Sequence, residues 1–332
     1  MTPRASAGFL SSDRSFLLPR GRHVATADRP PRGYPIDLSV KAQEPRWKEA
    51  WRSDPGAQLH VVLIQHGLGC YERYLGGDGD EWLETMLATA RHLAAVQVRA
   101  GRQAGGYPHR TPFPHSYRLV TPWLSAMAQG QAASLLIRAH IETGEDRFAE
   151  SALASLAPFG VPSGEGGVLA TLGGGPFLEE YPTTPVGSFV LNGAIFAIWG
   201  VLDVERVMSE SGQVSSAQLL GTLAGNLHRW DSGHWSRYDL YPHPVPNVAS
   251  SFYHLLHIHQ LEELSASHPD LTSFARYAAR FRDYRDARRD RLRAFCAKAA
   301  FRVLVPRNAT LARSLPWSPF HDTRRVPSST ST

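Results

Sequence analysis

The sequence has two cysteines among its 332 residues and no uninterrupted apolar segment of the roughly 18 residues that a membrane span requires. Cys70 and Cys296 lie far apart in helix-like segments, which favours two buried free thiols over a disulfide. The N-terminus contains arginines but no continuous apolar core, so we predict no signal peptide. From these absences we expect a cytoplasmic protein that does not contact a membrane.

Several motifs that carry chemistry are also missing. No glycine-rich loop follows a strand as in a dinucleotide-binding domain. Nothing resembles a helix-turn-helix, an RNP motif or a zinc finger, so we expect no nucleic-acid partner. The formal net charge of +5 would attract an anionic partner, but the charge does not select one kind of anion. We expect neither a cofactor nor a bound metal.

Helical periodicity dominates the chain from residue 34 to residue 300, which we predict to be one catalytic domain. Residues 1–33 and 306–332 are rich in Arg, Ser and Pro, and we predict disorder there. The helical segments form four successive pairs: 60–75 with 81–97, 123–143 with 147–158, 188–208 with 216–230, and 247–267 with 271–297.

Such helical hairpins cannot bury their apolar faces alone, so they are expected to stack. We predict a mainly α fold, an α/α toroid built as an incomplete or closed ring of helical hairpins. Short β hairpins are expected in the inter-helix loops, for example within the glycine-rich segment 164–181.

The stretch FLEEYPTTPVGSFVLNG, residues 177–193, places two carboxylates and a tyrosine before a proline-bounded turn and an apolar segment. One interpretation is a helix start, where carboxylates interact favourably with the helix dipole. Another is proton transfer, for which glutamate and tyrosine are suitable groups. A free tyrosine titrates near about pH 10, so it is a poor base unless its pKa is lowered, but it can donate a proton without such help.

Together with WLSAMAQGQAASLLIRA (123–139), SRYDL (236–240) and SSFYHLLHIHQL (250–261), this stretch resembles the C-terminal catalytic domain of the D-glucuronyl C5-epimerase family. The resemblance runs from about residue 34 to about residue 290 and is weaker before residue 110. It implies an enzyme that converts D-glucuronic acid to L-iduronic acid residues in a heparosan-like polysaccharide.

Epimerisation at C5 removes the proton next to the carboxylate and returns it to the opposite face of the ring, which requires two acid/base groups. The resemblance implies that Glu180 and Tyr181 line the active site, and that Tyr238 and Tyr253 match two further tyrosines implicated in catalysis. We predict that Glu180, supported by Tyr181, works one face and Tyr253 the other. Tyr238 would hold or protonate the substrate nearby.

The reaction also needs a group that neutralises the substrate carboxylate as the carbanion forms. Family members similar to the animal enzymes have an arginine directly after YDL, where this chain has Tyr241. Arg237 is a candidate substitute, although neighbouring side chains of an extended segment point to opposite faces, and His243 is another candidate.

Four other polar residues complete the predicted substrate-binding set. Gln129 and Asn192 could reach sugar hydroxyls or satisfy the backbone. His254 and His257 lie about one helical turn apart, and we predict that they form hydrogen bonds in or near the cleft. A shared metal is disfavoured because no further ligand motif is nearby.

We therefore predict a cofactor-independent uronyl C5-epimerase that acts on an acidic polysaccharide or oligosaccharide, and we allow for a homodimer. A polysaccharide lyase is one alternative, because it begins with the same proton abstraction and then eliminates the group at C4. A non-catalytic carbohydrate-binding toroid is another, because Tyr241 replaces the arginine. A hydrolase would need paired carboxylates, and the sequence has one convincing carboxylate site.

Overall fold

Helices dominate the computed structural model, which describes residues 32–43, 60–110, 117–209 and 212–306. The predicted disordered segments lie outside these residues, apart from positions 32, 33 and 306. The α-helices are α2 (His60–Leu75), α3 (Glu81–Val96), α4 (Ala126–Thr143), α5 (Asp146–Ser155), α6 (Leu191–Met208), α7 (Ser216–Asn226), α8 (Ser251–Ser267), α9 (Ser273–Asp286) and α10 (Arg288–Leu304).

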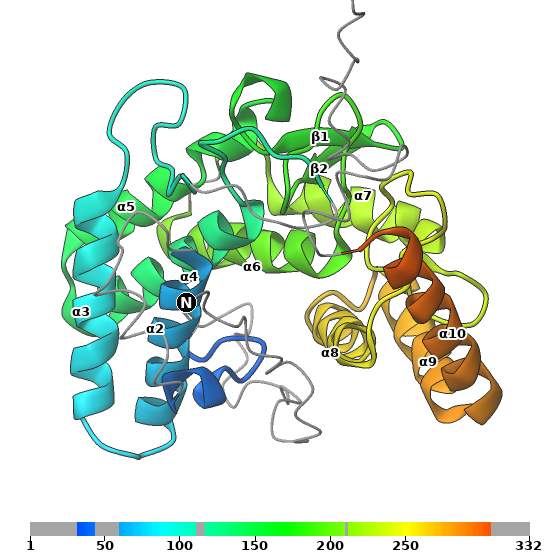
Figure 1. Cartoon of the computed structure of the whole chain (residues 1–332). Coiled ribbons are helices and arrows are strands. Elements are labelled where there is room, and N and C mark those ends of the chain that lie inside the picture. Colours follow the sequence, from blue (N-terminus) through cyan, green and yellow to red (C-terminus); the bar gives the residue numbers. More distant parts are fainter. Residues whose placement is uncertain (1–31, 44–59, 111–116, 210–211, 307–332) are drawn as a thin grey trace, which may run out of the picture.

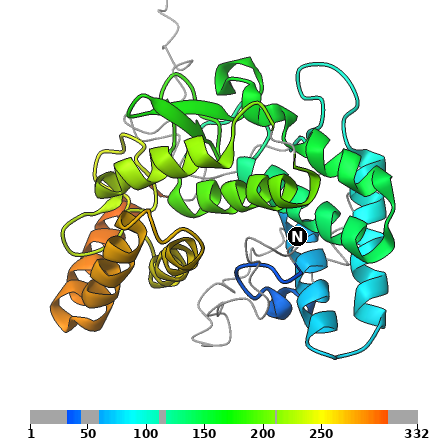
Figure 2. The ribbon, with the colours of Figure 1, turned by 180° about the vertical axis from the view of Figure 1, so that it is seen from behind.

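Consecutive helices pack as hairpins, α2 with α3, α4 with α5, α6 with α7 and α8 with α9. The first helices of these hairpins also contact one another in order, α2 with α4, α4 with α6 and α6 with α8. The hairpins follow an open arc, with α2 and α3 at one end and α8 to α10 at the other (Figures 1 and 2). The prediction of a mainly α fold of helical hairpins is confirmed, in the form of an incomplete ring.

Three predicted helices begin later than the periodicity suggested, at Ala126, Leu191 and Ser251. Two of these starts are capped by serine side chains, which satisfy amide groups that have no partner within the helix. Ser125 accepts from the Ala128 N–H and Ser250 from the Tyr253 N–H. The residues just before these helices are therefore extended and can contribute to a site.

The predicted helix 271–297 is two helices instead, because Ala287 adopts extended backbone angles between α9 and α10. The second of these helices continues to Leu304. The prediction that both cysteines are buried is wrong for Cys296, which lies exposed on α10, whereas Cys70 is buried. Both are free thiols, as expected.

The glycine-rich segment forms the expected β hairpin, with antiparallel strands β1 (Leu169–Leu172) and β2 (Gly175–Leu178). Leu169 pairs with Leu178, and the connection is Gly173–Gly174. Both glycines have positive φ, 58° and 87°, as a two-residue turn that matches the strand twist requires. The chain leaves β2 directly into Glu179, so this hairpin sets the position of the EEY stretch.

Helices α4 and α6 meet backbone to backbone at the centre of the arc. A Cβ at Gly130 would lie 2.5 Å from Ala197 Cα, and one at Gly200 would lie 2.4 Å from Gly130 Cα. A side chain at either glycine would push the helices apart. The small residues of α4 and α6 therefore determine how closely the two central hairpins approach.

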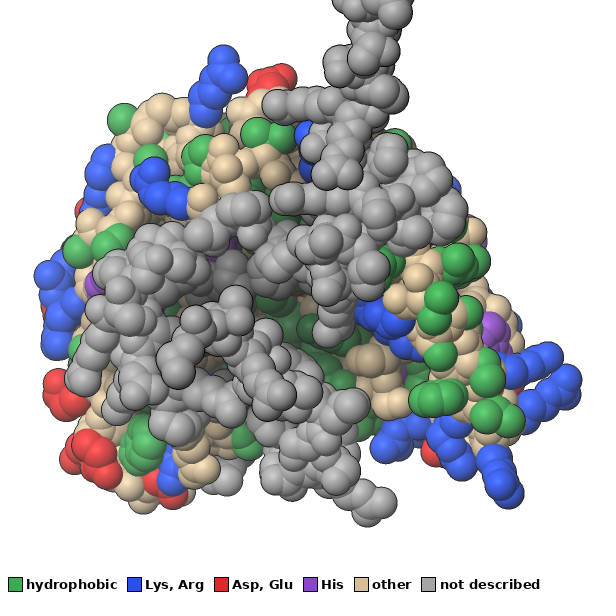
Figure 3. Space-filling view, in the orientation of Figure 1, with side chains coloured by type: hydrophobic (Ala, Val, Ile, Leu, Met, Phe, Trp, Pro, Cys, Tyr) green, Lys and Arg blue, Asp and Glu red, His purple; other side chains and the backbone are tan. Residues whose placement is uncertain are grey.

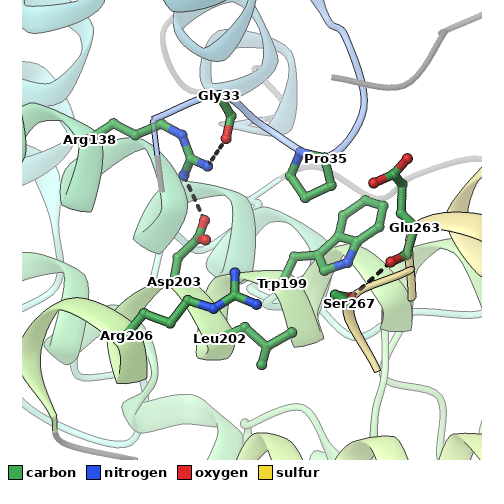
Figure 4. A pocket seen from close by; sticks show the side chains of 9 residues that line it. All are labelled: Gly33, Pro35, Arg138, Trp199, Leu202, Asp203, Arg206, Glu263 and Ser267. Atoms are coloured by element: carbon green, nitrogen blue, oxygen red, sulfur yellow. Dashed lines mark hydrogen bonds and ion pairs between the residues drawn. The ribbon is translucent and has the colours of Figure 1, made fainter. Parts of the chain in front are cut away.

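A buried ion pair reinforces this contact. Arg138 of α4 lies 2.6 Å from the Asp203 carboxylate of α6, and both side chains are inaccessible to solvent. The guanidinium also donates to the Gly33 carbonyl, so the N-terminal segment is fixed on the same two helices (Figure 4). The cavity beside this pair measures about 20 Å³, which is room for about one water molecule and excludes a sugar.

None of the described helices combines the length and hydropathy that crossing a bilayer would require.

We expect Gly130→Ala to lower the free energy of unfolding by about 2 kcal/mol or more, because the added methyl group would overlap the α6 backbone. Gly221→Ala is the matched control, since that exposed position in α7 has open space around it. This control should raise the stability by up to about 1 kcal/mol, through helix propensity. Urea unfolding of both variants measures the difference, and equal stabilities would contradict the proposed helix contact.

Candidate active site

Four tyrosines from separate parts of the chain gather between the hairpin end and α8. We call Tyr117, Tyr181, Tyr238 and Tyr253 the tyrosine cluster. The ring centroids of Tyr117 and Tyr181 are 5.1 Å apart, and those of Tyr238 and Tyr253 are 4.9 Å apart. Three of the rings are buried, whereas Tyr253 is partly exposed. The cluster therefore places several phenolic hydroxyls in one small region that reaches the surface at Tyr253.

A carboxyl group completes this region. The Tyr181 phenol interacts with the Glu180 carboxyl group, and the Tyr238 phenol interacts with Tyr181. Glu180 is buried, with 3% of its surface exposed, and its Oε2 has no hydrogen-bond partner within the described part of the chain. The structure thus brings three of the four predicted proton-transfer residues into mutual contact.

The neighbouring carboxylate, Glu179, fixes the backbone from which Glu180 projects. It accepts hydrogen bonds from the Ser188 N–H at 3.0 Å, from the Ser188 hydroxyl and from the Phe189 N–H. The Glu179 carbonyl accepts from the Ala126 N–H at the start of α4. These bonds close the proline-containing loop and hold Phe189 in a left-handed conformation with φ of 49°. Glu179 is therefore a structural residue, and Glu180 projects elsewhere.

The Glu180 carboxylate lies against the first turn of α6. A Cβ at Gly193 would come within 2.2 Å of Glu180 Oε2, so only glycine leaves room for the carboxyl group in this position. The N-terminal end of a helix carries a partial positive charge, which favours a nearby anion. A glycine is therefore needed at position 193 because the Glu180 side chain occupies the adjacent space, and not because two helices pack closely there.

Burial changes the proton affinity of these groups. Removal from water raises the pKa of Glu180 to about 8, and the nearby Glu179 carboxylate acts in the same direction. Burial also raises the pKa of Tyr181 and Tyr238 well above the ordinary value, reinforced by the Glu180 charge. Near neutral pH, therefore, these two tyrosines hold their protons firmly, and Glu180 can exchange its own.

Tyr238 and Tyr253 are positioned by backbone contacts. The Tyr238 N–H donates to the Asn247 carbonyl, and its carbonyl accepts from the Leu191 N–H at the start of α6. Tyr253 lies in the first turn of α8, which the Ser250 side chain caps. The extended segment and the helix start therefore bring these two rings together with an interplanar angle of 63°.

Sequence reasoning missed a second buried carboxylate, Asp239, which follows Tyr238 in the SRYDL motif. It accepts hydrogen bonds from the Tyr117 hydroxyl and from the Asn247 side-chain amide. The Asn247 side-chain carbonyl in turn accepts from Lys298 of α10 at 2.7 Å. Its position next to Tyr238 could have identified Asp239 as a candidate site residue. Nothing in the sequence identified Lys298, because it lies beyond the segment that resembles the epimerases.

Several predicted substrate-binding residues are bonded within the protein. Gln129 is fully buried, accepts from the Tyr107 N–H and donates to the carbonyls of Gly105 and Ser155. One ring nitrogen of His254 forms a hydrogen bond with the Ser236 hydroxyl, and the other forms one with the Phe281 carbonyl. These contacts give both side chains a structural role, and a role in sugar binding stays a prediction.

The other three predicted binding residues keep unused polar atoms within the described part of the chain. His257 bonds Ser236 through Nδ1, and its Nε2 is buried without a partner. Asn192, one residue before the glycine that faces Glu180, has a buried Oδ1 without a partner. Arg237 is half-buried with an unpartnered Nε. No group of three His, Cys, Asp or Glu side chains among the described residues could hold a metal ion.

Comparison with known proteins identifies the family. A model of the D-glucuronyl C5-epimerase C-terminus matches residues 101–283, which is more than half of the chain, and the chain belongs to this family. A D-glucuronyl C5-epimerase of Caenorhabditis elegans is 33% identical over 171 residues, covering 46% of this chain and 28% of that relative. The matched part is thus well under half the length of the relative.

Among solved structures, the chain is similar to an unsaturated glucuronyl hydrolase from Bacillus sp. GL1, responsible for the degradation of glycosaminoglycan. The TM-score is 0.47 at 15% sequence identity, with 81% of this chain and 79% of that chain covered.

We expect the contribution of Glu180 to the stability of the protein to fall as pH rises from about 4.5 towards 8, because the folded state holds the Glu180 proton more tightly than the unfolded state does. Glu180→Gln removes this dependence, since the amide does not ionise. The variant should gain stability over the wild type by about 1 kcal/mol or more between pH 5.5 and pH 8.5, at about 1.36 kcal/mol per pKa unit.

Thermal unfolding at a series of pH values measures this difference. Glu84→Gln, at an exposed position of α3, is the matched control and should leave the shape of the wild-type curve unchanged. Parallel curves for Glu180→Gln and the wild type would contradict a buried, proton-binding Glu180.

Proposed function

We propose that the protein is a uronyl C5-epimerase that converts D-glucuronic to L-iduronic acid residues in an acidic, heparosan-like polysaccharide. The observation that carries the proposal is the buried group of Glu180, Tyr181 and Tyr238, which interact with one another beside the partly exposed ring of Tyr253. Family membership supports the same activity. The reaction needs one group that removes the C5 proton and another that delivers a proton to the opposite face.

Glu180 is the base in this proposal. A general base works best when its pKa lies near the operating pH, and burial brings the pKa of Glu180 to about 8. The hydrogen bond from Tyr181 stabilises the ionised carboxylate before it accepts the C5 proton. Tyr181 therefore tunes and orients the base, and the phenol of Tyr238 supports Tyr181 from the other side.

Tyr253 is the proton donor in this proposal. Glu180 follows β2, whereas Tyr253 comes from α8, so the two groups approach the site from different elements. A phenol that delivers its proton to C5 becomes a phenolate, and the ring of Tyr238 lies beside it, with ring centroids 4.9 Å apart. The reverse epimerisation uses the same groups with their roles exchanged.

The charge of the C-terminal helices supports an acidic polymer as the substrate. The α9 sequence has four arginines and two aspartates, and α10 has five arginines, one lysine and one aspartate. Basic side chains project from the edge of the molecule where these helices lie, whereas acidic side chains gather near the α2–α3 turn (Figure 3). A positive field of this kind raises the local concentration of a polyanion.

Incubation with heparosan in deuterated water tests the reaction. We expect deuterium at C5 together with iduronate signals in the NMR spectrum. An unsaturated product that absorbs ultraviolet light would instead indicate a lyase, and binding without C5 exchange would indicate a carbohydrate-binding protein. Either result would contradict the epimerase.

Removal of single hydroxyls tests the roles of the tyrosines. We expect Tyr253→Phe and Tyr181→Phe to lower the rate of iduronate formation by about 100-fold or more, the range for loss of a general acid or base. Tyr277→Phe is the matched control, because that ring packs on Phe281 in α9, and its rate of iduronate formation should equal that of the wild type. Circular dichroism checks the fold, and an unchanged rate in both site variants would contradict the assignment.

A further inference from the structure

Helix α10 contributes directly to the tyrosine cluster, although it lies beyond the residues that match the family model. Ala294 is part of the same buried hydrophobic cluster as Tyr181 and Tyr238, and Ala297 packs against it. Lys298, the next residue, is half-buried on this turn of α10. The helix therefore presents a basic side chain at the site, between apolar residues that hold it there.

The Lys298 ammonium group is held in a defined position. It donates hydrogen bonds of 2.7 Å to the Asn247 side-chain carbonyl and to the Val248 backbone carbonyl. It lies 5.9 Å from the ring centroid of Tyr238 and 5.3 Å from that of Phe301, within the range of cation–π attraction. The charge thus lies beside a ring of the tyrosine cluster, oriented by two short bonds.

The proposed reaction requires a cation close to the substrate carboxylate. Loss of the C5 proton delocalises negative charge onto the substrate carboxylate, and a fixed positive group stabilises that charge. This chain has Tyr241 where the similar animal enzymes have an arginine. The Tyr241 ring lies against Tyr117, with centroids 5.5 Å apart, in the same region as Tyr238.

The alternative cation, Arg237, is less well placed. Its neighbour Ser236 bonds the histidines of α8, and its other neighbour, Tyr238, belongs to the tyrosine cluster. Arg237 itself forms a backbone bridge with Val248. Lys298, in contrast, has a measured contact with a ring of the cluster.

We propose that Lys298 supplies the positive charge that binds the C5 carboxylate of the uronate and replaces the arginine absent at Tyr241. The proposal rests on the proposed function and adds a specificity-determining residue to it. Lys298 would then select uronate over neutral sugar, through an ion pair formed while Asn247 and Val248 keep the ammonium group in place.

Binding of two matched oligosaccharides tests this selection without requiring turnover. One is a heparosan oligosaccharide, and the other is the same oligosaccharide with its carboxyl groups chemically reduced to alcohols. We expect the wild-type protein to bind the uronate form at least 10-fold more tightly in calorimetry. Lys298→Met and Lys298→Gln should lose most of this preference, whereas Lys298→Arg should keep most of it.

The glutamine variant separates charge from structure, because its amide can still donate to Asn247 and Val248. If Lys298→Gln keeps the uronate preference, the lysine is only a structural brace and the proposal is wrong. Loss of the preference in Arg237→Gln, with Lys298→Gln unaffected, would assign the carboxylate to Arg237 and would also overturn it.

The proposed function has a separate readout. C5 deuterium exchange in the wild-type protein together with a preserved preference in Lys298→Gln would overturn the lysine assignment alone. Absence of both exchange and heparosan binding in the wild type would overturn the epimerase and the lysine assignment together.

Discussion

The bonds that the Glu179 carboxylate accepts from Ser188 and Phe189 are the interaction on which the rest of the site depends. They close the loop after β2 and fix the direction in which Glu180 leaves the backbone. The carbonyl of Ser188 then accepts from the Leu240 N–H, which ties this loop to the segment that carries Tyr238. A buried carboxylate thus connects two irregular segments, each of which carries a predicted proton-transfer residue.

Two adjacent glutamates in one buried stretch show how environment separates their roles. Glu179 accepts several hydrogen bonds from backbone and hydroxyl donors, which partly offset its burial and leave its pKa at about 7. Glu180 receives a single tyrosine hydroxyl and keeps one oxygen without a partner within the described residues. A carboxylate with all its acceptor positions filled is suited to hold structure, whereas one with an open oxygen is suited to exchange a proton.

Much of this arrangement could be predicted from the sequence. The helical hairpins follow from apolar periodicity, and the β turn follows from Gly173–Gly174, because few other residues adopt its backbone angles. Helix ends were less predictable, since apolar residues such as Trp123 continue the periodicity beyond the caps. Glu180 and Tyr181 could be identified as candidates because charged and phenolic groups beside a buried segment indicate a structural or functional role.

The remaining parts of the site depend on contacts between distant segments, which one sequence does not reveal. Tyr117 reaches Asp239 across 122 positions, and Lys298 reaches Asn247 across 51. Because Ala294 packs into the tyrosine cluster while Lys298 bonds the segment that fixes Tyr238, α10 both covers the site and constrains it. The predicted proton-transfer groups and most of their surroundings lie within the family-matching segment, whereas α10, which packs against them, lies beyond it.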